Sequence, residues 1–186
     1  PIAGIRIGRI AGEFVAFPLA ENTHEQGMLV RSVAPANVTD ETETQARRAA
    51  RKIAERLDYV GVFAIEFFDV GGRLLANEMA PRVHNTGHWT IEGARTSQFE
   101  NHVRAVMGLP LGSAEATGHS VMLNIIGKRP APDALAGVTG AHIHDYAKAE
   151  RKGRKIGHIT LTGPDATICR EQAEIVNGRL GNLMPG

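Results

Sequence analysis

The sequence contains one cysteine and no long apolar segment. Because Cys169 is the single cysteine among 186 residues, no disulfide can form within the chain, and we expect a protein of the reducing cytoplasm. No apolar run approaches the roughly 20 residues that span a bilayer, so the sequence predicts no membrane segment. The 21 basic and 20 acidic side chains nearly cancel, so the overall charge favours neither nucleic acid nor a membrane surface as a partner.

Several well-known motifs are also absent. There is no GxxxxGK[ST] loop, no GxGxxG after a strand, and no serine or cysteine in a recognisable nucleophile setting. Phosphate chemistry in this chain would therefore not be of the P-loop kind. The first residue is Pro1, without a start methionine or a signal-peptide pattern, and we expect the chain to be part of a longer protein.

What is present is a chain with 42% hydrophobic residues, enough for one domain with an additional lobe. Its periodicity predicts an α+β fold, with a boundary that divides residues 1–112 from residues 113–186. The expected strands are 5–10, 13–19, 28–33, 61–70, 73–79, 120–126, 141–146 and 155–162, and the expected helices are 40–57, 91–107 and 165–180, with one helical turn at 130–135.

Two apolar runs on either side of Gly71-Gly72 predict a β-hairpin. Each run contains a carboxylate, Glu66 in VFAIEFF and Glu78 in LLANEM, where a glutamate rarely lies without a partner. Two carboxylates on adjacent strands repel each other unless a cation or a shared proton separates them. Such oxygen ligands suit Mg²⁺, which uses one or two carboxylates together with substrate phosphates. In the alternative interpretation, both glutamates point to solvent.

The register of this hairpin separates the two interpretations. A strict two-residue turn at Gly71-Gly72 would pair Glu66 with Asn77 and place Glu78 on the opposite face. A three-residue loop or a β-bulge would instead place Glu66 across from Glu78. The metal hypothesis therefore predicts a bulged or longer connection.

A polar loop follows the hairpin after Pro81. Its residues Arg82, His84 and Asn85 provide a guanidinium, an imidazole and an amide, a set that can hold a carboxylate, bicarbonate or phosphoryl group. In the alternative interpretation, this is a surface loop with incidental histidines. The spacing of His84 and His88 does not predict zinc, because no helix and no adjacent glutamate support it.

Five cations lie within eight residues between two of the expected strands. Gly153 among them lets the backbone approach a ligand closely, so this cationic loop can hold a phosphate monoester through charge-assisted hydrogen bonds. In the alternative interpretation, it is a solvated surface loop. The cations are Lys148, Arg151, Lys152, Arg154 and Lys155.

Three segments of the sequence resemble one enzyme family. The longest is EFFDVGGRLLANEMAPRVHNTGHWTIEGARTSQFENHVRAVMGLPLG, and FPLAENTHEQGMLVRSVAPA and YAKAERKGRKIGHITL accompany it. They resemble the N5-carboxyaminoimidazole ribonucleotide synthetases, ATP-grasp enzymes of purine biosynthesis. That family uses ATP and bicarbonate to carboxylate the exocyclic amine of 5-aminoimidazole ribonucleotide, releasing ADP and phosphate. The resemblance implies the second half of an ATP-grasp domain followed by a small mixed α/β lobe.

The resemblance also implies a nucleotide site with ATP and Mg²⁺ as cofactors. Glu66 and Glu78 would hold the Mg²⁺ ions that bridge the ATP phosphates, with Asn77 beside them. Ala80 occupies the position where many other ATP-grasp enzymes have a third metal ligand, an asparagine, which favours the synthetase type over its relatives.

Substrate roles are implied for the two polar loops. Bicarbonate or carboxyphosphate would lie near Arg82, His84 and Asn85, while Val83 and Thr86 replace a proline and a serine that are common in the family. The residues implied to bind the ribonucleotide phosphate are Lys148, Arg154 and Lys155.

The family's nucleotide-fold domain and its glycine-rich ATP-clamping lobe are not in this sequence. We therefore expect the isolated chain to be inactive and the full-length protein to be a homodimer, as is common for parent enzymes of this type. Two alternatives stay open. One is another ATP-grasp carboxylase with a different acceptor, which would not need the cationic loop. The other is a non-catalytic phosphate-binding module.

Overall fold

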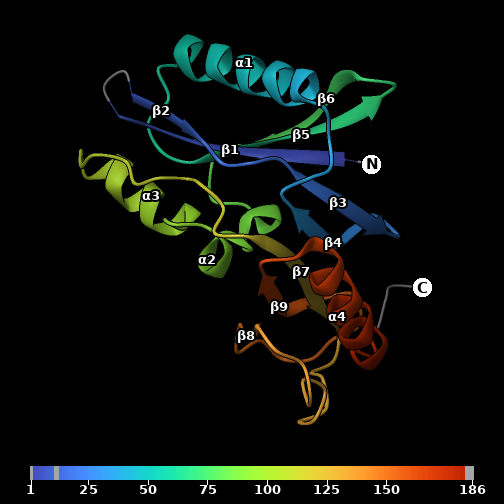
Figure 1. Ribbon diagram of the computed structural model, residues 1–186. Helices are drawn as coiled ribbons and strands as arrows, with labels where there is room; N and C mark the ends of the chain where they lie inside the picture. The colour runs from blue at the N-terminus through green and yellow to red at the C-terminus, as the bar shows by residue number, and fades with distance from the viewer. Residues whose placement is uncertain (1, 11–12, 183–186) are drawn as a thin grey trace.

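The computed structural model describes residues 2–10 and 13–182. Antiparallel strands form one sheet in the order β6-β5-β1-β3-β4-β7-β9-β8, with β2 attached to β1 (Figure 1). This architecture confirms the α+β class. The strands are β1 (Ile2–Ile10), β2 (Glu13–Ala16), β3 (Ala20–Glu25), β4 (Met28–Ala34), β5 (Phe63–Val70), β6 (Arg73–Ala80), β7 (His119–Ile126), β8 (Ala141–Asp145) and β9 (Lys155–Gly163), and the α-helices are α1 (Asp40–Arg56), α2 (Thr90–Gly93), α3 (Gln98–Val106) and α4 (Ala166–Arg179).

Helix α1 covers one end of the sheet. The Thr39 side chain accepts a hydrogen bond from the backbone N–H of Thr42 and so caps the helix, and acidic residues fill its first turn. Alanines at positions 46, 50 and 54 are fully buried, so the helix approaches the sheet closely. They pack against Phe63 and Ile65 of β5, and the core on this side holds the β5–β6 hairpin in place.

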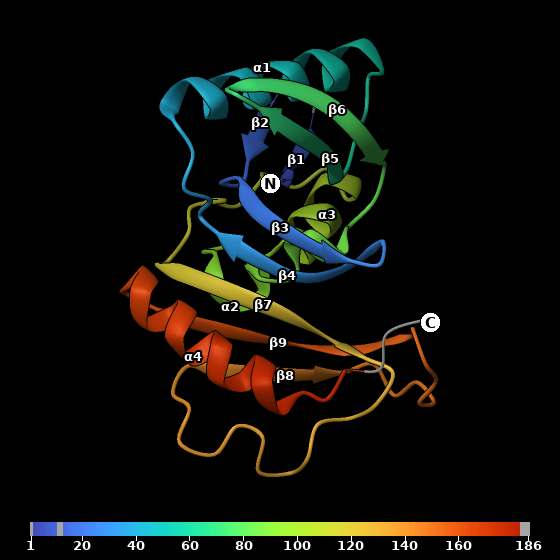
Figure 2. The same cartoon turned by 90° about the vertical axis from the view of Figure 1, so that its right-hand side faces the viewer.

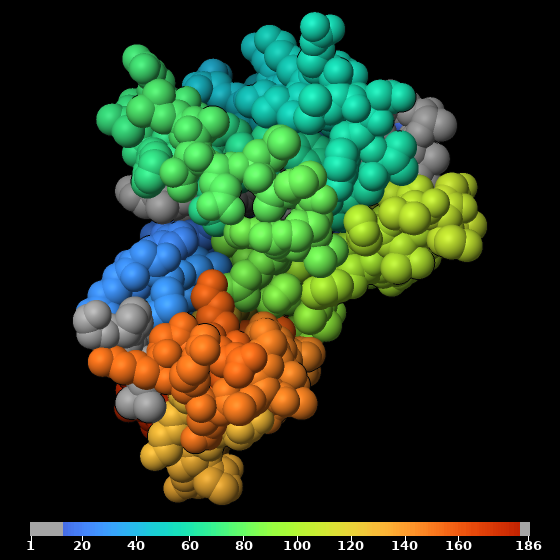
Figure 3. All heavy atoms as spheres, turned by 180° about the vertical axis from the view of Figure 1, so that it is seen from behind, coloured from blue at the N-terminus to red at the C-terminus, as the bar shows by residue number. Residues whose placement is uncertain are grey.

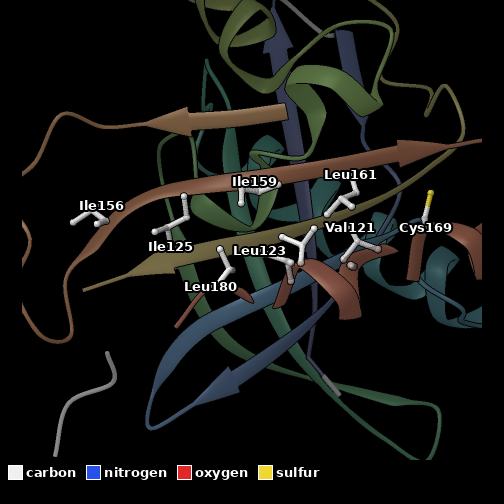
Figure 4. Packing of buried hydrophobic residues seen from close by; sticks show 10 residues of the cluster. Val121, Leu123, Ile125, Ile156, Ile159, Leu161, Cys169 and Leu180 are labelled. Atoms are coloured by element: carbon white, nitrogen blue, oxygen red, sulfur yellow. The ribbon is translucent and has the colours of Figure 1, made fainter. Parts of the chain in front are cut away.

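Helix α4 covers the other end, where it lies across β7 and β9 (Figure 2). The strand residues Leu123 and Ile159 point toward the helix, and Cys169 and Val176 of α4 complete a second apolar cluster (Figure 4). Between the two ends β4 pairs with β7, so the sheet is continuous from the first half of the chain to the second. The division at residues 112 and 113 stays a prediction.

Most expected elements are confirmed, and three differ. The single helix expected at 91–107 is wrong: Ala94 forms a bridge with Ala116 instead, and Ser97 then caps the separate helix α3. The helical turn expected at 130–135 is wrong as well, because residues 132–137 form consecutive turns. Strand β3 was not expected, since its sequence AENTHE is polar. Within the described residues, no helix is long and apolar enough to cross a membrane.

Candidate functional site

The β5–β6 hairpin brings its two glutamates together through a β-bulge. Gly71 and Gly72 have φ values of 61° and 82° and form a two-residue turn, so that Val70 pairs with Arg73. The register then shifts between Phe67 and Glu66, and Glu66 lies opposite Glu78. The predicted bulge is therefore confirmed, although the turn itself is the short one.

The two glutamates differ in exposure. Glu66 is only 6% exposed, so the interpretation in which both carboxylates point to solvent is wrong for Glu66. Glu78 is exposed, and Asn77 beside it is exposed too. One carboxylate is thus fixed in the protein, while the other is open to a ligand.

The loop after the hairpin places His84 next to Glu66. The Nδ1 atom of His84 is 3.9 Å from Oε1 of Glu66 and 3.1 Å from Oγ1 of Thr86. The buried side chain of Gln98 hydrogen-bonds both backbone polar groups of His84. Its Oε1 accepts from the His84 N–H at 3.0 Å, and its Nε2 donates to the His84 carbonyl at 2.9 Å. The imidazole is therefore supported by a rigid backbone.

Lys155 joins this site from the far end of the chain. Its Nζ donates to Oδ1 of Asn85 at 3.1 Å. Burial lowers the pKa of Lys155, while the negative charge of Glu66 acts in the opposite direction, so the ammonium and this carboxylate are close enough to interact. The fold thus brings Lys155 of β9 to Glu66, His84 and Asn85, which all belong to the first half of the chain.

The sequence motifs did not point to His24, which β3 places in the same site. Burial lowers the pKa of His24, the Lys155 ammonium lowers it further, and Glu78 opposes the change. A neutral imidazole therefore lies near both an ammonium and the open carboxylate. The segment FPLAENTHEQG that carries His24 belongs to the resemblance, and this was the signal that could have found it. Figure 3 shows the blue, green and orange parts of the chain meeting on one face.

The remaining predicted residues are cations of the two polar loops. Arg82 is exposed and donates from Nη1 to the carbonyl of its neighbour Val83 at 3.1 Å. Lys148 is exposed, with its Nζ 5.1 Å from the centre of the Tyr146 ring. Arg154 is half-buried in the cationic loop. Arg82 and Lys148 are thus exposed cations of the two polar loops, whereas Lys155 is bonded to Asn85 in the site.

The residues present fit a hard divalent cation that is shared with a substrate. Glu66 and Glu78 offer carboxylate oxygens on facing strand positions, the donor type that Mg²⁺ prefers. Among the residues that the structure describes, no cluster of three or more His, Cys, Asp or Glu side chains could hold a metal by itself. Two carboxylates leave coordination positions for water and phosphate oxygens, which is the usual arrangement for Mg²⁺ with a nucleotide.

Solved structures share the fold of this chain. The N5-carboxyaminoimidazole ribonucleotide synthetase of Thermus thermophilus superimposes with a TM-score of 0.95 and 48% identity, over 100% of this chain and 52% of that one. The Aspergillus clavatus synthase in complex with ADP and 5-aminoimidazole ribonucleotide superimposes with a TM-score of 0.84 and 35% identity, over 95% of this chain and 51% of that one.

Sequence comparisons find relatives with the same enzyme name. Relatives called N5-carboxyaminoimidazole ribonucleotide synthase are 52% identical in Vibrio cholerae, over 82% of this chain and 40% of the relative, and in Pseudomonas aeruginosa, over 88% and 45%. The chain thus spans less than half the length of these relatives. Residues 2–99 match the ATP-grasp domain, and residues 120–172 match the phosphoribosylaminoimidazole carboxylase C-terminal domain. The chain therefore belongs to the ATP-grasp family, and its resemblance to the N5-carboxyaminoimidazole ribonucleotide synthases is confirmed.

Proposed function

We propose that this chain is part of an ATP-dependent ligase that carboxylates 5-aminoimidazole ribonucleotide with bicarbonate. The products would be N5-carboxyaminoimidazole ribonucleotide, ADP and phosphate. The observation that carries the proposal is the pairing of Glu66 with Glu78 beside the Lys155 ammonium, because it combines a place for a metal–nucleotide complex with a cation for an anionic reactant.

The two glutamates would hold Mg²⁺, which when bound neutralises charge on the ATP phosphates. Glu66 is buried and fixed by its strand, so it would define the position of the nucleotide phosphates. Glu78 is exposed and would engage them from the solvent side. Catalysis of this kind depends mainly on positioning and on charge stabilisation, and less on covalent chemistry by the protein.

The loop and Lys155 would hold bicarbonate in line with the transferred phosphoryl group. The resemblance assigned Lys155 to the ribonucleotide phosphate, but we place it with bicarbonate because its Nζ is bonded to Asn85 of the polar loop. The Asn85 amide and the Lys155 ammonium are already hydrogen-bonded to each other, so they present one preformed group of donors. His84 lies within 3.9 Å of Glu66 and would orient the same anion. Because a reactive acyl phosphate hydrolyses in water, a second lobe that closes over the site would protect it.

The cations Arg82, Lys148 and Arg154 would attract the anionic substrates, with Lys148 and Arg154 on the ribonucleotide phosphate. The full-length protein would work as a homodimer in the cytoplasm, and the single cysteine in this part of the chain supports the reducing location. Since the chain covers less than half of its curated relatives, we expect no turnover by the chain alone.

The test is ADP release by the full-length protein, measured with ATP and Mg²⁺ while bicarbonate and 5-aminoimidazole ribonucleotide are omitted in turn. We expect ADP release to require both. Release that needs bicarbonate but not the ribonucleotide would favour a carboxylase with a different acceptor. Nucleotide binding without any turnover would favour a non-catalytic module, and turnover by the isolated chain would contradict the need for a second lobe.

A further inference from the structure

A row of polar side chains crosses the C-terminal part of the sheet. Asn124 on β7 pairs with His158 on β9, and His158 pairs with His144 on β8. Residues directly opposite each other in antiparallel strands share a face, so the three side chains form one polar row. The adjacent strand residues Leu123 and Ile159 point to the other face and pack with α4 (Figure 4). The polar row therefore faces away from that apolar cluster.

The segment from Asn85 to Glu92, which begins in the polar loop and continues beyond it, lies along this polar row. Three of its residues, separated by three and four positions, contact one row member each. That spacing places them on one side of a helical segment, so the segment meets the row along its length. The contacts are Asn85 with Asn124 (2.7 and 3.1 Å), the ring of His88 with that of His158 (5.0 Å between centroids), and Glu92 with His144 (2.6 Å).

Asn124 determines which way the Asn85 amide faces. Nδ2 of Asn124 donates to the backbone carbonyl of Leu29 at 2.8 Å, and because a carbonyl only accepts, the nitrogen of the Asn124 amide must lie there. The second hydrogen on Nδ2 of Asn124 is then donated to Oδ1 of Asn85 at 2.7 Å. In return, Oδ1 of Asn124 accepts a hydrogen bond from Nδ2 of Asn85 at 3.1 Å. The orientation of one amide fixes that of the other.

The fixed orientation has a consequence for Lys155. Oδ1 of Asn85 is the atom that accepts from Lys155 Nζ at 3.1 Å. If the Asn85 amide turned over, its Nδ2 would face the ammonium, and two donors would oppose each other. Asn124 is fully buried, with its Nδ2 donating to two acceptors and its Oδ1 accepting one hydrogen bond, so it has no freedom to turn with Asn85.

We propose that Asn124 is a positioning residue for the carboxylation site, which keeps the Asn85 carbonyl oxygen on Lys155 and thereby holds the ammonium beside Glu66. This inference rests on the proposed function and adds a residue to it from the second half of the chain. Asn124 acts through Asn85, and no direct contact with nucleotide or anion is assigned to it.

The first test uses the full-length protein with Asn124→Asp, which keeps the shape but replaces the donating amide nitrogen. The matched control is Asn101→Asp, another buried asparagine, whose partner is the backbone of Gly112. We expect kcat to fall by about 10- to 100-fold in Asn124→Asp, as for other lost supports of reacting groups, while the KM for ATP stays within about twofold. The control Asn101→Asp should lower the thermal stability about as much as Asn124→Asp does, but it should leave kcat unchanged.

A double-mutant cycle with Asn85→Ala separates positioning from a purely structural role. If Asn124 acts through Asn85, Asn124→Asp should not lower kcat further once Asn85→Ala is present. Equal losses of kcat in both backgrounds would overturn the proposal. So would an unchanged kcat in Asn124→Asp. Should this variant not fold, Asn124→Ser takes its place with Asn101→Ser as its control.

A second readout does not need catalysis. In the same full-length protein, acylation of Lys155 at pH 9 is followed by mass spectrometry. We expect Asn124→Ser to raise the rate by roughly threefold or more, because a lysine side chain that loses its fixed acceptor moves more freely and reaches the reagent more often. Asn101→Ser should leave the rate unchanged. If Lys155 is acylated at the same rate in both variants, the role of Asn124 is overturned. A wild-type protein that shows no ribonucleotide-dependent turnover would instead refute only the proposed function.

Discussion

Glu66 lies directly across from Glu78, although a turn of only two residues joins their strands. A regular hairpin with this turn would pair Glu66 with Asn77 instead. The extra residue in β6 produces the bulge that changes the register, and it does so at the place where two carboxylates need to converge. The bulge is therefore the local feature on which the proposed metal–nucleotide site depends.

Removing either carboxylate should weaken binding of the nucleotide only when Mg²⁺ is present. We expect Glu66→Gln and Glu78→Gln to lower the affinity of the full-length protein for Mg²⁺-ADP by about tenfold or more, since a ligand to the cation is lost. Isothermal titration calorimetry measures this, with Glu55→Gln on the exposed side of α1 as the control. Binding that is unaffected by either substitution would contradict the assignment.

The cations of the basic loop should differ strongly in importance. Lys155 is half-buried and bonded to Asn85, whereas Lys152 of the same loop is exposed. We expect Lys155→Met to reduce kcat/KM by about 100-fold or more, because a preorganised charge in the site is lost. Lys152→Met should change it by less than about threefold, as for an exposed charge. Similar losses in the two variants, measured by ADP release, would contradict the placement of Lys155.

Lys155 should also set an alkaline limit on activity. Burial lowers its pKa below the ordinary value of 10.5, so the ammonium loses its proton at a lower pH than a free lysine does. We therefore expect kcat/KM to fall on the alkaline side below pH 10.5. In Lys155→Arg, whose guanidinium keeps its proton, the fall should move to higher pH. A pH profile that is the same in wild type and variant would rule Lys155 out as its cause.

His158 should make the protein sensitive to acid. Burial, with the nearby His144 as a smaller cause, lowers the pKa of His158 from 6.5 to about 3. The unfolded chain binds a proton at His158 more readily than the folded protein does. The folded state is therefore at its full stability above pH 6.5, and its free energy of unfolding decreases as the pH falls toward 3. The plot of unfolding free energy against pH should be less steep in His158→Gln, by about 1.4 kcal/mol per pH unit between roughly pH 4 and 6. Urea unfolding followed by Trp89 fluorescence tests this, and equal slopes would contradict it.

The pairing of β8 with β9 should depend on a missing side chain at Gly157. A Cβ there would lie 2.4 Å from the carbonyl oxygen of His144, which no real contact permits. We expect Gly157→Ala to cost about 1 to 3 kcal/mol of unfolding free energy, because backbone must move. Gly178→Ala in α4 meets nothing within 4 Å and should instead add up to about 1 kcal/mol. Equal stability of the two variants in urea unfolding would contradict this explanation.

Local signals in the sequence were enough for the hairpin and the long helices. The diglycine turn, the Thr39 cap of α1 and the Asp165 cap of α4 act on neighbouring residues, so their effects can be predicted without the fold. The helix expected at 91–107 failed because Ala94 finds a partner in Ala116, which is distant in the sequence. Pairing at such a distance overrides helix propensity.

The polar half of the site could not be predicted in the same way. Strand β3 is central in the sheet, yet its sequence AENTHE, which includes His24 of the site, is polar, so the hydrophobic alternation of an ordinary strand is missing. Asn124 lies in an apolar strand and shows no motif. Its role depends on the reciprocal pair with Asn85, which lies 39 positions away. Only the folded chain brings such groups together.

The most direct measurement is anomalous diffraction from Mn²⁺, used in place of Mg²⁺, in crystals of the full-length protein with ADP. We predict a peak at coordination distance, about 2.0 to 2.6 Å, from carboxylate oxygens of both Glu66 and Glu78 and from the nucleotide phosphates. A peak that bridges the phosphates but touches neither glutamate would contradict the assignment of these carboxylates as metal ligands.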